Sequence, residues 1–290
     1  MCTVFAFMNL KGGVGKTVLA ANLAREIAAQ RAKRILLIDL DPQCSLSYLF
    51  DEANKIAKLE KRSTALEAIW PTGERADLLK TPRVLHEDKP GLFSSGPKGR
   101  VELIPGSMEI YKVITNAGVN VRLQCIQNFR DFVRDAATKY DYIVVDTNPS
   151  TNIGTLCALA AADFVVAPMK MDIFSVQGIM MLEEIFGDEF ECVKIEAKRV
   201  IGVWNMMDPK LRNSNTTSAI EKSLHSANKS LFAASIGTRI YETGYLKYMN
   251  HKGFIHNFGR VQRRDFFNRT RGELTEVCKE LLQRAEQPRA

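Results

Sequence analysis

The chain has 290 residues, 46% of them hydrophobic and 25% charged, which is enough apolar content for one large core. We therefore expect a single domain spanning residues 1–290. The scattered cysteines form no Cys-x-x-Cys pair, which argues against a disulfide framework or a zinc site, and no run of about 18 apolar residues marks a membrane span.

The formal net charge of +7 is unevenly distributed along the chain. Residues 191–290 hold 18 Lys and Arg against 10 Asp and Glu, whereas residues 1–190 hold 22 against 23. This asymmetry suggests that a polyanion, either nucleic acid or an acidic membrane, docks on the C-terminal third; an ordinary solvated basic surface is the alternative. No secretory leader precedes the first expected strand, so we expect a cytoplasmic protein.

The first half of the chain begins with buried strands. Apolar runs at residues 3–8 and 34–39 predict parallel strands, and the segment between them predicts a helix with Leu19, Leu23 and Ile27 on one face. Residues 51–100 are the least regular stretch, with a short helix expected at 65–70.

The second half alternates strands with helices. The expected strands are 101–105, 142–146, 164–168 and 200–205, and the expected helices are 119–140, 152–161, one through Ile179, Leu182 and Ile185, and 262–286. Strands that alternate with helices predict an α/β fold, with a mostly parallel twisted sheet and helices on both faces.

A glycine-rich turn, Lys11-Gly12-Gly13-Val14-Gly15-Lys16-Thr17, joins the first strand to the first helix. Backbone N–H groups in such a turn can wrap a phosphate at a helix N-terminus. Lys16 would place its charge on the β- and γ-phosphates, and the Thr17 hydroxyl would ligate Mg²⁺. The general pattern requires glycine at position 10, where this chain has Leu10.

Carboxylates follow two of the expected strands. Asp39 and Asp41 stand in Ile38-Asp39-Leu40-Asp41-Pro42-Gln43, and Asp146 ends the strand at 142–146. Ligands of open α/β sheets bind beside the carboxyl ends of the strands. Asp39 and Asp41 could therefore serve Mg²⁺ waters and an attacking water, and Asp146 could hold the Mg²⁺ shell through water.

The turn with its extra Lys11 resembles the deviant Walker A motif of the ParA/Soj/MinD family of P-loop ATPases, and the Asp39–Gln43 segment is similar to the family's D-x-D-P-Q motif. The resemblance implies a P-loop NTPase fold and a slow, partner-stimulated ATPase that uses ATP and Mg²⁺. It implies that Lys11 reaches the partner's ATP in a homodimer with the nucleotides sandwiched between subunits. It also implies that Asp41 positions or activates the hydrolytic water and that Asp39 supports the metal shell.

Other landmarks match the family less closely. The layout from Pro168 to Gly178 is similar, and Asn205 matches a position that meets the adenine base in relatives. Asn148 replaces a proline or alanine found in relatives, which leaves the hydrolysis rate open. Ile236-Gly237-Thr238 replaces an Ile-Pro-Arg stretch at the base pocket.

The expected nucleotide contacts are Lys11, Gly12, Gly13, Val14, Gly15, Lys16, Thr17, Val18 and Asn205. Thr17, Asp39 and Asp146 are expected at the metal.

The resemblance to partition ATPases implies an ATP-bound dimer that binds non-specific double-stranded DNA, associates with the nucleoid, and segregates or positions DNA or another cargo. A ParB-like adaptor would stimulate hydrolysis. Basic side chains in the C-terminal third are the candidate phosphate contacts. They are Lys210, Arg212, Lys247, Lys252, Arg260, Arg263, Arg264, Arg269 and Arg271.

Three alternatives stay open. A MinD-like protein would insert the apolar face of its C-terminal helix into a membrane, but Leu281 and Leu282 are expected in the core. A reductase similar to the nitrogenase iron protein would need cysteines in glycine-flanked settings, which Cys125 and Cys157 lack. A scaffold that binds ATP without hydrolysing it is kept open by Asn148 and Gly237.

Overall fold

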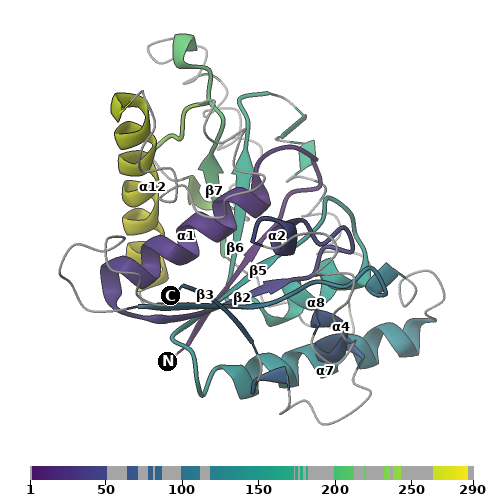
Figure 1. Cartoon of the computed structure of the whole chain (residues 1–290). Helices are drawn as coiled ribbons and strands as arrows, with labels where there is room; N and C mark the ends of the chain where they lie inside the picture. The colour runs from purple at the N-terminus through teal and green to yellow at the C-terminus, as the bar shows by residue number, and fades with distance from the viewer. Residues whose placement is uncertain are drawn as a thin grey trace.

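A computed structural model gives the fold of the chain (Figure 1). It describes residues 2–50, 64–70, 78–80, 82–86, 99–111, 118–172, 174–175, 177–178, 181, 199–211, 219, 232–235, 238–242 and 264–286.

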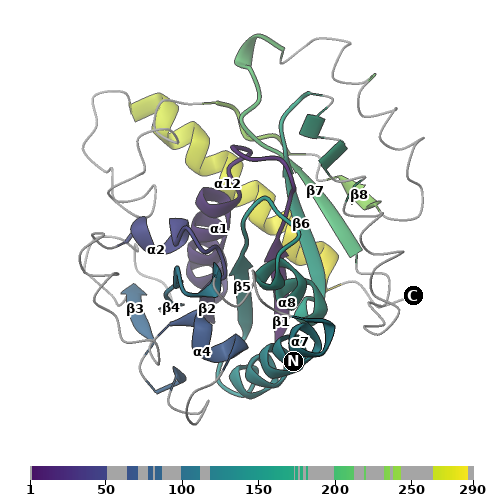
Figure 2. The same ribbon diagram turned by 90° about the vertical axis from the view of Figure 1, so that its right-hand side faces the viewer.

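An eight-stranded sheet, in the order β3-β4-β2-β5-β1-β6-β7-β8, forms the centre of the molecule (Figures 1 and 2). All neighbouring strands are parallel except β3 and β4, which pair antiparallel at one edge. The strands are β1 (Thr3–Phe7), β2 (Arg34–Asp39), β3 (Arg83–His86), β4 (Arg100–Ile104), β5 (Tyr142–Asp146), β6 (Phe164–Met169), β7 (Arg199–Trp204) and β8 (Phe232–Ser235).

Helices cover both faces of the sheet (Figures 1 and 2). On one face α1 packs against α12 and the short α2, and on the other α7 packs against α4 and α8. The helices are α1 (Lys16–Arg31), α2 (Ser45–Tyr48), α4 (Ala65–Ile69), α7 (Val119–Ala136), α8 (Ile153–Ala161) and α12 (Arg264–Ala285), with a 3₁₀ turn at Pro209–Leu211. The predicted α/β architecture is therefore confirmed.

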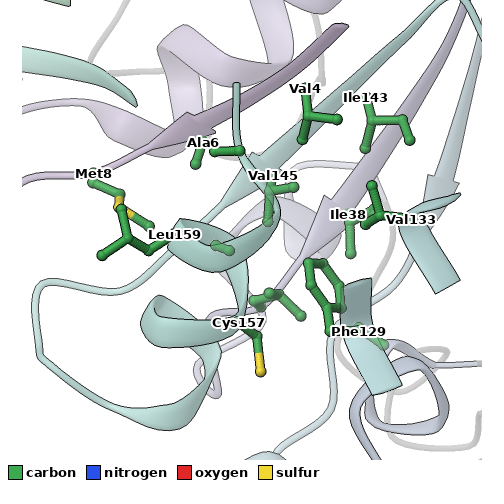
Figure 3. Close-up of a cluster of buried hydrophobic side chains, with 14 of the residues drawn as sticks. Val4, Ala6, Met8, Ile38, Phe129, Val133, Ile143, Val145, Cys157 and Leu159 are labelled. Carbon is green, nitrogen blue, oxygen red and sulfur yellow. The ribbon is translucent and has the colours of Figure 1, made fainter. Parts of the chain in front are cut away.

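Side chains that alternate along the strands divide the core into two layers. In β1, Phe5 and Phe7 face α1, whereas Val4 and Ala6 face α7 and α8, because successive residues of a strand point to opposite faces. Figure 3 shows the second layer, where Phe129 of α7 lies with side chains of the central strands. Such burial on both faces explains why the strands are nearly continuous apolar runs.

The strand register brings predicted site residues together at the carboxyl ends of the parallel strands. Phe7 pairs with Asp146, and Asp39 also pairs with Asp146. The turn after β1 therefore lies beside the end of β5, and the end of β2 lies on the other side of β5. Open α/β sheets bind ligands at these carboxyl ends of the strands.

Most element boundaries agree with the sequence prediction within a few residues, although α7 ends at Ala136 rather than near Tyr140. The edge strands β3 and β8 were not expected, because both are short and β3 lies in the irregular 51–100 stretch. Ile179, Leu182 and Ile185, expected in a helix after β6, lie outside the described residues. Within the described part of the chain, no helix combines the length and the apolar character needed to cross a membrane.

Candidate nucleotide-binding site

The glycine-rich turn lies between β1 and the first residue of α1, Lys16. Gly13 and Gly15 have φ angles of 70° and 86°, in the left-handed region that favours glycine. No acidic residue stands in the first turn of α1. The free N–H groups and the positive end of the helix dipole are therefore available to an anion such as phosphate.

Asn205, directly after β7, supports this turn. Its buried side-chain amide donates a hydrogen bond to the carbonyl of Val14, with 2.8 Å between the nitrogen and the oxygen. A Cβ atom built on Gly15 would lie 2.4 Å from the same amide nitrogen. Glycine at position 15 is thus required by both its backbone angle and its neighbour. The predicted contact of Asn205 with the adenine base stays a prediction.

Lys16 is buried at the base of the turn, with 7% of its surface exposed. Its ammonium donates to the carbonyl of Asn9 at 3.1 Å and to that of Lys11 at 3.5 Å. Burial lowers the pKa of this lysine, while the nearby carboxylates of Asp146 and Asp41 act to raise it. The carbonyl contacts are weaker partners than an anion, so phosphate oxygens would compete for this ammonium effectively.

Asp146 is fully buried at the end of β5, and neither of its carboxylate oxygens has a hydrogen-bond partner of acceptable geometry. Burial raises its pKa strongly and Asp39 adds to the effect, whereas the Thr17 hydroxyl lowers it. The Thr17 hydroxyl is therefore near the carboxylate without making a well-formed hydrogen bond to it. A buried carboxylate without a well-formed hydrogen bond is rare and calls for an explanation such as a bound ion. The carboxylate of Asp146 and the hydroxyl of Thr17 fit Mg²⁺, which prefers oxygen ligands and keeps several of its waters.

The described residues contain no group of three or more His, Cys, Asp or Glu side chains that could hold a metal ion. A magnesium ion here would need phosphate oxygens and water to complete its coordination, as is usual for Mg²⁺ at nucleotide sites. The site therefore suits Mg²⁺ together with a nucleotide better than Mg²⁺ alone.

Asp39 is held by the loop that follows it. One of its oxygens accepts from the N–H of Asp41 at 3.1 Å, and the other accepts from the N–H of Ser47 at 2.8 Å and its hydroxyl at 2.6 Å. Burial raises the pKa of Asp39 to about 7, although these hydrogen bonds act to lower it. Both oxygens thus have protein donors, so the structure ties Asp39 to the loop that carries Asp41. Its support of the metal shell stays a prediction.

Asp41 is nearly buried and accepts a hydrogen bond from the N–H of Gln43 at 2.8 Å. Burial raises the pKa of its carboxyl, opposed by Lys16. Ser47 also accepts a hydrogen bond from the N–H of Gly106 at 2.8 Å, which connects this loop to the end of β4. Ser47 was not predicted as a site residue, because a serine a few residues after the Asp39–Gln43 segment carries no distinguishing signal.

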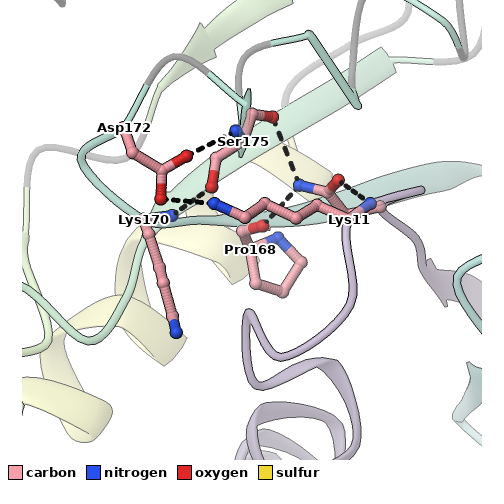
Figure 4. Close-up of polar contacts among 6 residues, drawn as sticks. Lys11, Pro168, Lys170, Asp172 and Ser175 are labelled. Atoms are coloured by element: carbon pink, nitrogen blue, oxygen red, sulfur yellow. Dashed lines mark hydrogen bonds and ion pairs between the residues drawn. The ribbon is translucent and has the colours of Figure 1, made fainter.

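Lys11 and the residues after β6 form a polar cluster (Figure 4). The Lys11 ammonium contacts the carboxylate of Asp172, and its backbone N–H donates to the side chain of Asn9 at 2.8 Å. The Asn9 amide in turn donates to the carbonyl of Pro168 at 2.8 Å. Asn9 and Asp172 were not among the predicted site residues, although a polar residue directly before the glycine turn was a usable signal for Asn9.

Gly178 explains one weak landmark of the sequence. A Cβ atom at this position would lie 2.4 Å from the side-chain oxygen of Asn9 and 3.1 Å from the backbone nitrogen of Lys11. The segment after β6 can therefore pack this closely against the start of the turn only with glycine there.

Asn148 belongs to a hydrogen-bonded network at the start of α8. Its side chain donates to the hydroxyl of Ser150 at 2.9 Å and accepts from the amide of Asn152 at 2.7 Å. Asn152 caps the helix by accepting from the N–H of Thr155 at 3.0 Å. The departure from the family's proline or alanine is thus accommodated by local hydrogen bonds.

The predicted basic surface is described in part. Lys210 and Arg271 are exposed, whereas Arg269 pairs with Glu273 at 3.0 Å and stacks over the ring of Tyr241. The side chain of Arg264 and the residues Arg212, Lys247, Lys252, Arg260 and Arg263 lie outside what the structure describes.

Two alternatives lose their support in the described core. Leu281 and Leu282 are fully buried in the layer between α12 and α1, so they are not available for membrane insertion. Cys125 and Cys157 are fully buried in α7 and α8, which does not suit ligands of a cluster shared between two subunits. Their burial and that of Cys278 are typical of free cysteines, which behave as small core residues.

Comparison with known proteins agrees with this geometry. The family model for the AAA domain (AAA_31) matches residues 2–191. An uncharacterised protein of Pseudomonas putida is 31% identical over 220 residues, which cover 76% of this chain and 75% of that protein. The chromosome partitioning protein ParA of Myxococcus xanthus is 32% identical over 181 residues, which cover 62% of this chain and 56% of that protein.

Solved structures show the same fold. The structure of pNOB8 ParA superposes with a TM-score of 0.74 at 20% identity and covers 99% of both chains. A structure of pNOB8 ParA bound to nonspecific DNA superposes with a TM-score of 0.68 at 21% identity over the full length of both.

Proposed function

Because this chain belongs to the AAA-domain (AAA_31) family and is a P-loop ATPase of the ParA type, we propose that it is an ATP-switched dimer that binds non-specific DNA and thereby segregates or positions DNA or another cargo. One observation carries the proposal: a glycine turn flanked by Lys11 and Lys16 lies beside the end of β5, close to the buried carboxylate of Asp146, which has no well-formed hydrogen bond. A phosphate chain with Mg²⁺ would supply anionic oxygens to the turn and a cation to the Asp146 carboxylate.

The turn binds the phosphates of ATP through its backbone N–H groups, and the Lys16 ammonium moves from backbone carbonyls to phosphate oxygens. Thr17 and Asp146 are the residues that would hold Mg²⁺. When bound, Mg²⁺ neutralises charge on the phosphate oxygens. Each of these contacts positions the nucleotide at the carboxyl ends of β1 and β5.

Asp41 orients the attacking water. Its carboxylate is buried, which raises its pKa and makes it a better proton acceptor. Asp39 holds the Asp41 backbone in place through the 3.1 Å hydrogen bond. Catalysis of phosphoryl transfer depends chiefly on such positioning and on charge stabilisation, so a site completed by a second subunit is a slow switch.

Lys11 completes the site of the partner subunit in the proposed dimer. ATP binding assembles the dimer and hydrolysis dissolves it, so ATP selects one of two states. Two lysines at each site also compensate the negative charge of two nucleotide-bearing faces that must approach one another.

DNA is the proposed partner of the ATP-bound dimer. The charge surplus of residues 191–290 supports it, as does the fold shared with a ParA that was solved with nonspecific DNA. The dimer then associates with the nucleoid, its affinity falls steeply with salt, and a ParB-like adaptor stimulates hydrolysis.

The oligomeric part of the proposal is tested by sedimentation velocity. The Asp41→Ala variant, which retains ATP, should sediment as a dimer with Mg-ATP and as a monomer with ADP or without nucleotide. Lys16→Ala should remain a monomer in all three conditions. A monomeric Asp41→Ala protein at saturating ATP would overturn the proposal.

A further inference from the structure

The ammonium of Lys11, the residue expected to act on a partner's nucleotide, is bound within its own subunit (Figure 4). It forms an ion pair with Asp172, and it also lies 5.7 Å from the centre of the Phe174 ring, within cation–π range. The Lys11 and Asp172 side chains remain 25% and 35% exposed. The pair is thus at the surface, where a second subunit can reach it.

The carboxylate of Asp172 also has a backbone hydrogen bond that does not involve Lys11. Its second oxygen accepts a hydrogen bond from the N–H of Ser175 at 2.7 Å. The Ser175 hydroxyl accepts from the N–H of Lys170 at 3.1 Å, which closes the loop after β6. A carboxylate held in this way loses little rotational freedom on pairing, so the pair is stronger than a contact between two mobile side chains.

The backbone of Lys11 is fixed to the same loop. The side chain of Asn9 accepts from the Lys11 N–H and donates to the carbonyls of Pro168 and Ser175. Lys11 and Asp172 are therefore joined to the same hydrogen-bonded network, which is formed by Asn9, Pro168 and Ser175. Only the lysine side chain has to rotate for the pair to open.

We propose that Asp172 is a positioning residue that retains the Lys11 ammonium on its own subunit and so raises the protein and ATP concentrations needed for dimerisation. The inference rests on the proposed role of Lys11 in a partner's site. Lys11 cannot occupy both positions, so each subunit must open its ion pair when the dimer forms. Asp172 therefore makes ATP-dependent dimerisation less favourable.

The size of the effect follows from the exposure of the pair. Partly exposed ion pairs contribute about 0.2–1 kcal/mol, or about 1.4- to 5-fold in an equilibrium constant. Because two pairs open per dimer, removing Asp172 should tighten the dimer dissociation constant by about 2- to 25-fold.

The first test addresses the ion pair in the nucleotide-free monomer. The acetylation rate of Lys11 is measured by mass spectrometry in the parent and in Asp172→Asn, whose amide oxygen can still accept from the Ser175 N–H. We expect Lys11 to react several-fold faster in Asp172→Asn, with no change in Asp135→Asn, which removes an exposed carboxylate at the far end of α7. An unchanged rate in Asp172→Asn would overturn the proposal.

The second test measures the dimer dissociation constant at saturating Mg-ATP in the Asp41→Ala background. Adding Asp172→Asn should lower the constant, whereas adding Asp135→Asn should not. A constant that is unchanged or raised by Asp172→Asn would refute the inference. If the Asp41→Ala protein does not dimerise at all, the proposed function fails, while the acetylation rates still report on the Lys11–Asp172 pair.

Discussion

The side-chain amide nitrogen of Asn205 lies 2.8 Å from the carbonyl oxygen of Val14, so the end of β7 supports the glycine turn that follows β1. These residues are 191 positions apart in the sequence. The close approach leaves no space for a side chain at Gly15, where a Cβ atom would lie 2.4 Å from the amide nitrogen. The shape of the phosphate-binding turn therefore depends on a strand far away in the chain.

Gly15→Ala and Gly13→Ala should differ in their effect on nucleotide binding. Both glycines have positive φ, which costs an alanine about 1–2 kcal/mol, but a Cβ atom at Gly13 meets nothing within 4 Å. We expect Gly15→Ala to lose ATP binding and Gly13→Ala to retain it with reduced affinity. Isothermal titration with ATP measures both. Equal affinities for the two variants would contradict the role of Asn205.

Lys16→Ala should abolish measurable ATP binding. The buried ammonium is placed to donate charge-assisted hydrogen bonds, each contributing about 1.5–3 kcal/mol, or roughly 10- to 150-fold in affinity. Fluorescent ATP titration measures the loss, and circular dichroism shows whether the variant is folded. Undiminished affinity in a folded Lys16→Ala protein would refute the assignment of the phosphate site.

The sequence predicted the strands and the carboxylates because both follow local rules. Apolar runs indicate buried parallel strands, and Asp39 and Asp146 stand directly at strand ends, so only the strand order was needed to bring them together. The supports of the site could not be predicted in this way. The contact of Asn9 with Pro168 spans 159 positions and exists because β1 lies between β5 and β6, which periodicity along the chain does not encode.

Ser47→Ala should slow hydrolysis while ATP affinity is retained. The Ser47 hydroxyl donates to Asp39 at 2.6 Å and accepts from the N–H of Gly106 at 2.8 Å, so its removal loosens the loop that carries Asp41. The unpaired Gly106 N–H should lower the free energy of unfolding by about 1–3 kcal/mol.

The measurements for Ser47→Ala are single-turnover phosphate release and urea denaturation. Ser107→Ala is a matched control, because its hydroxyl accepts only a 3.2 Å hydrogen bond from the N–H of Glu109 among the contacts that the described residues show. If Ser47→Ala hydrolyses ATP and unfolds like the parent, Ser47 does not position the loop.

Asp39 makes the stability of the nucleotide-free protein depend on pH. Its pKa is about 7 when folded and 3.8 in an unperturbed side chain, so between these values the folded protein holds a proton that the unfolded chain releases. The contribution of Asp39 to the free energy of unfolding should therefore fall by about 1.4 kcal/mol per pH unit as the pH rises through this window, and level off above pH 7. The raised pKa values of Asp41 and Asp146 act in the same direction.

Urea denaturation from pH 4.5 to 8 tests this dependence. Subtracting the free energy of unfolding of Asp39→Asn from that of the parent removes the contributions of titrating groups that do not interact with Asp39. Asp146, whose pKa Asp39 raises, remains in the difference and acts in the same direction. The difference should fall as the pH rises. A difference that is constant or that increases would show that Asp39 is ionised throughout the range.

The proposed function requires that ATP switch this protein onto DNA, and the direct measurement is the binding of Asp41→Ala to arbitrary double-stranded DNA with Mg-ATP, with ADP and without nucleotide. We predict binding with Mg-ATP alone, weakening steeply as salt rises and lost in Lys16→Ala. Equal binding in all three conditions, or none in any, would contradict the claim.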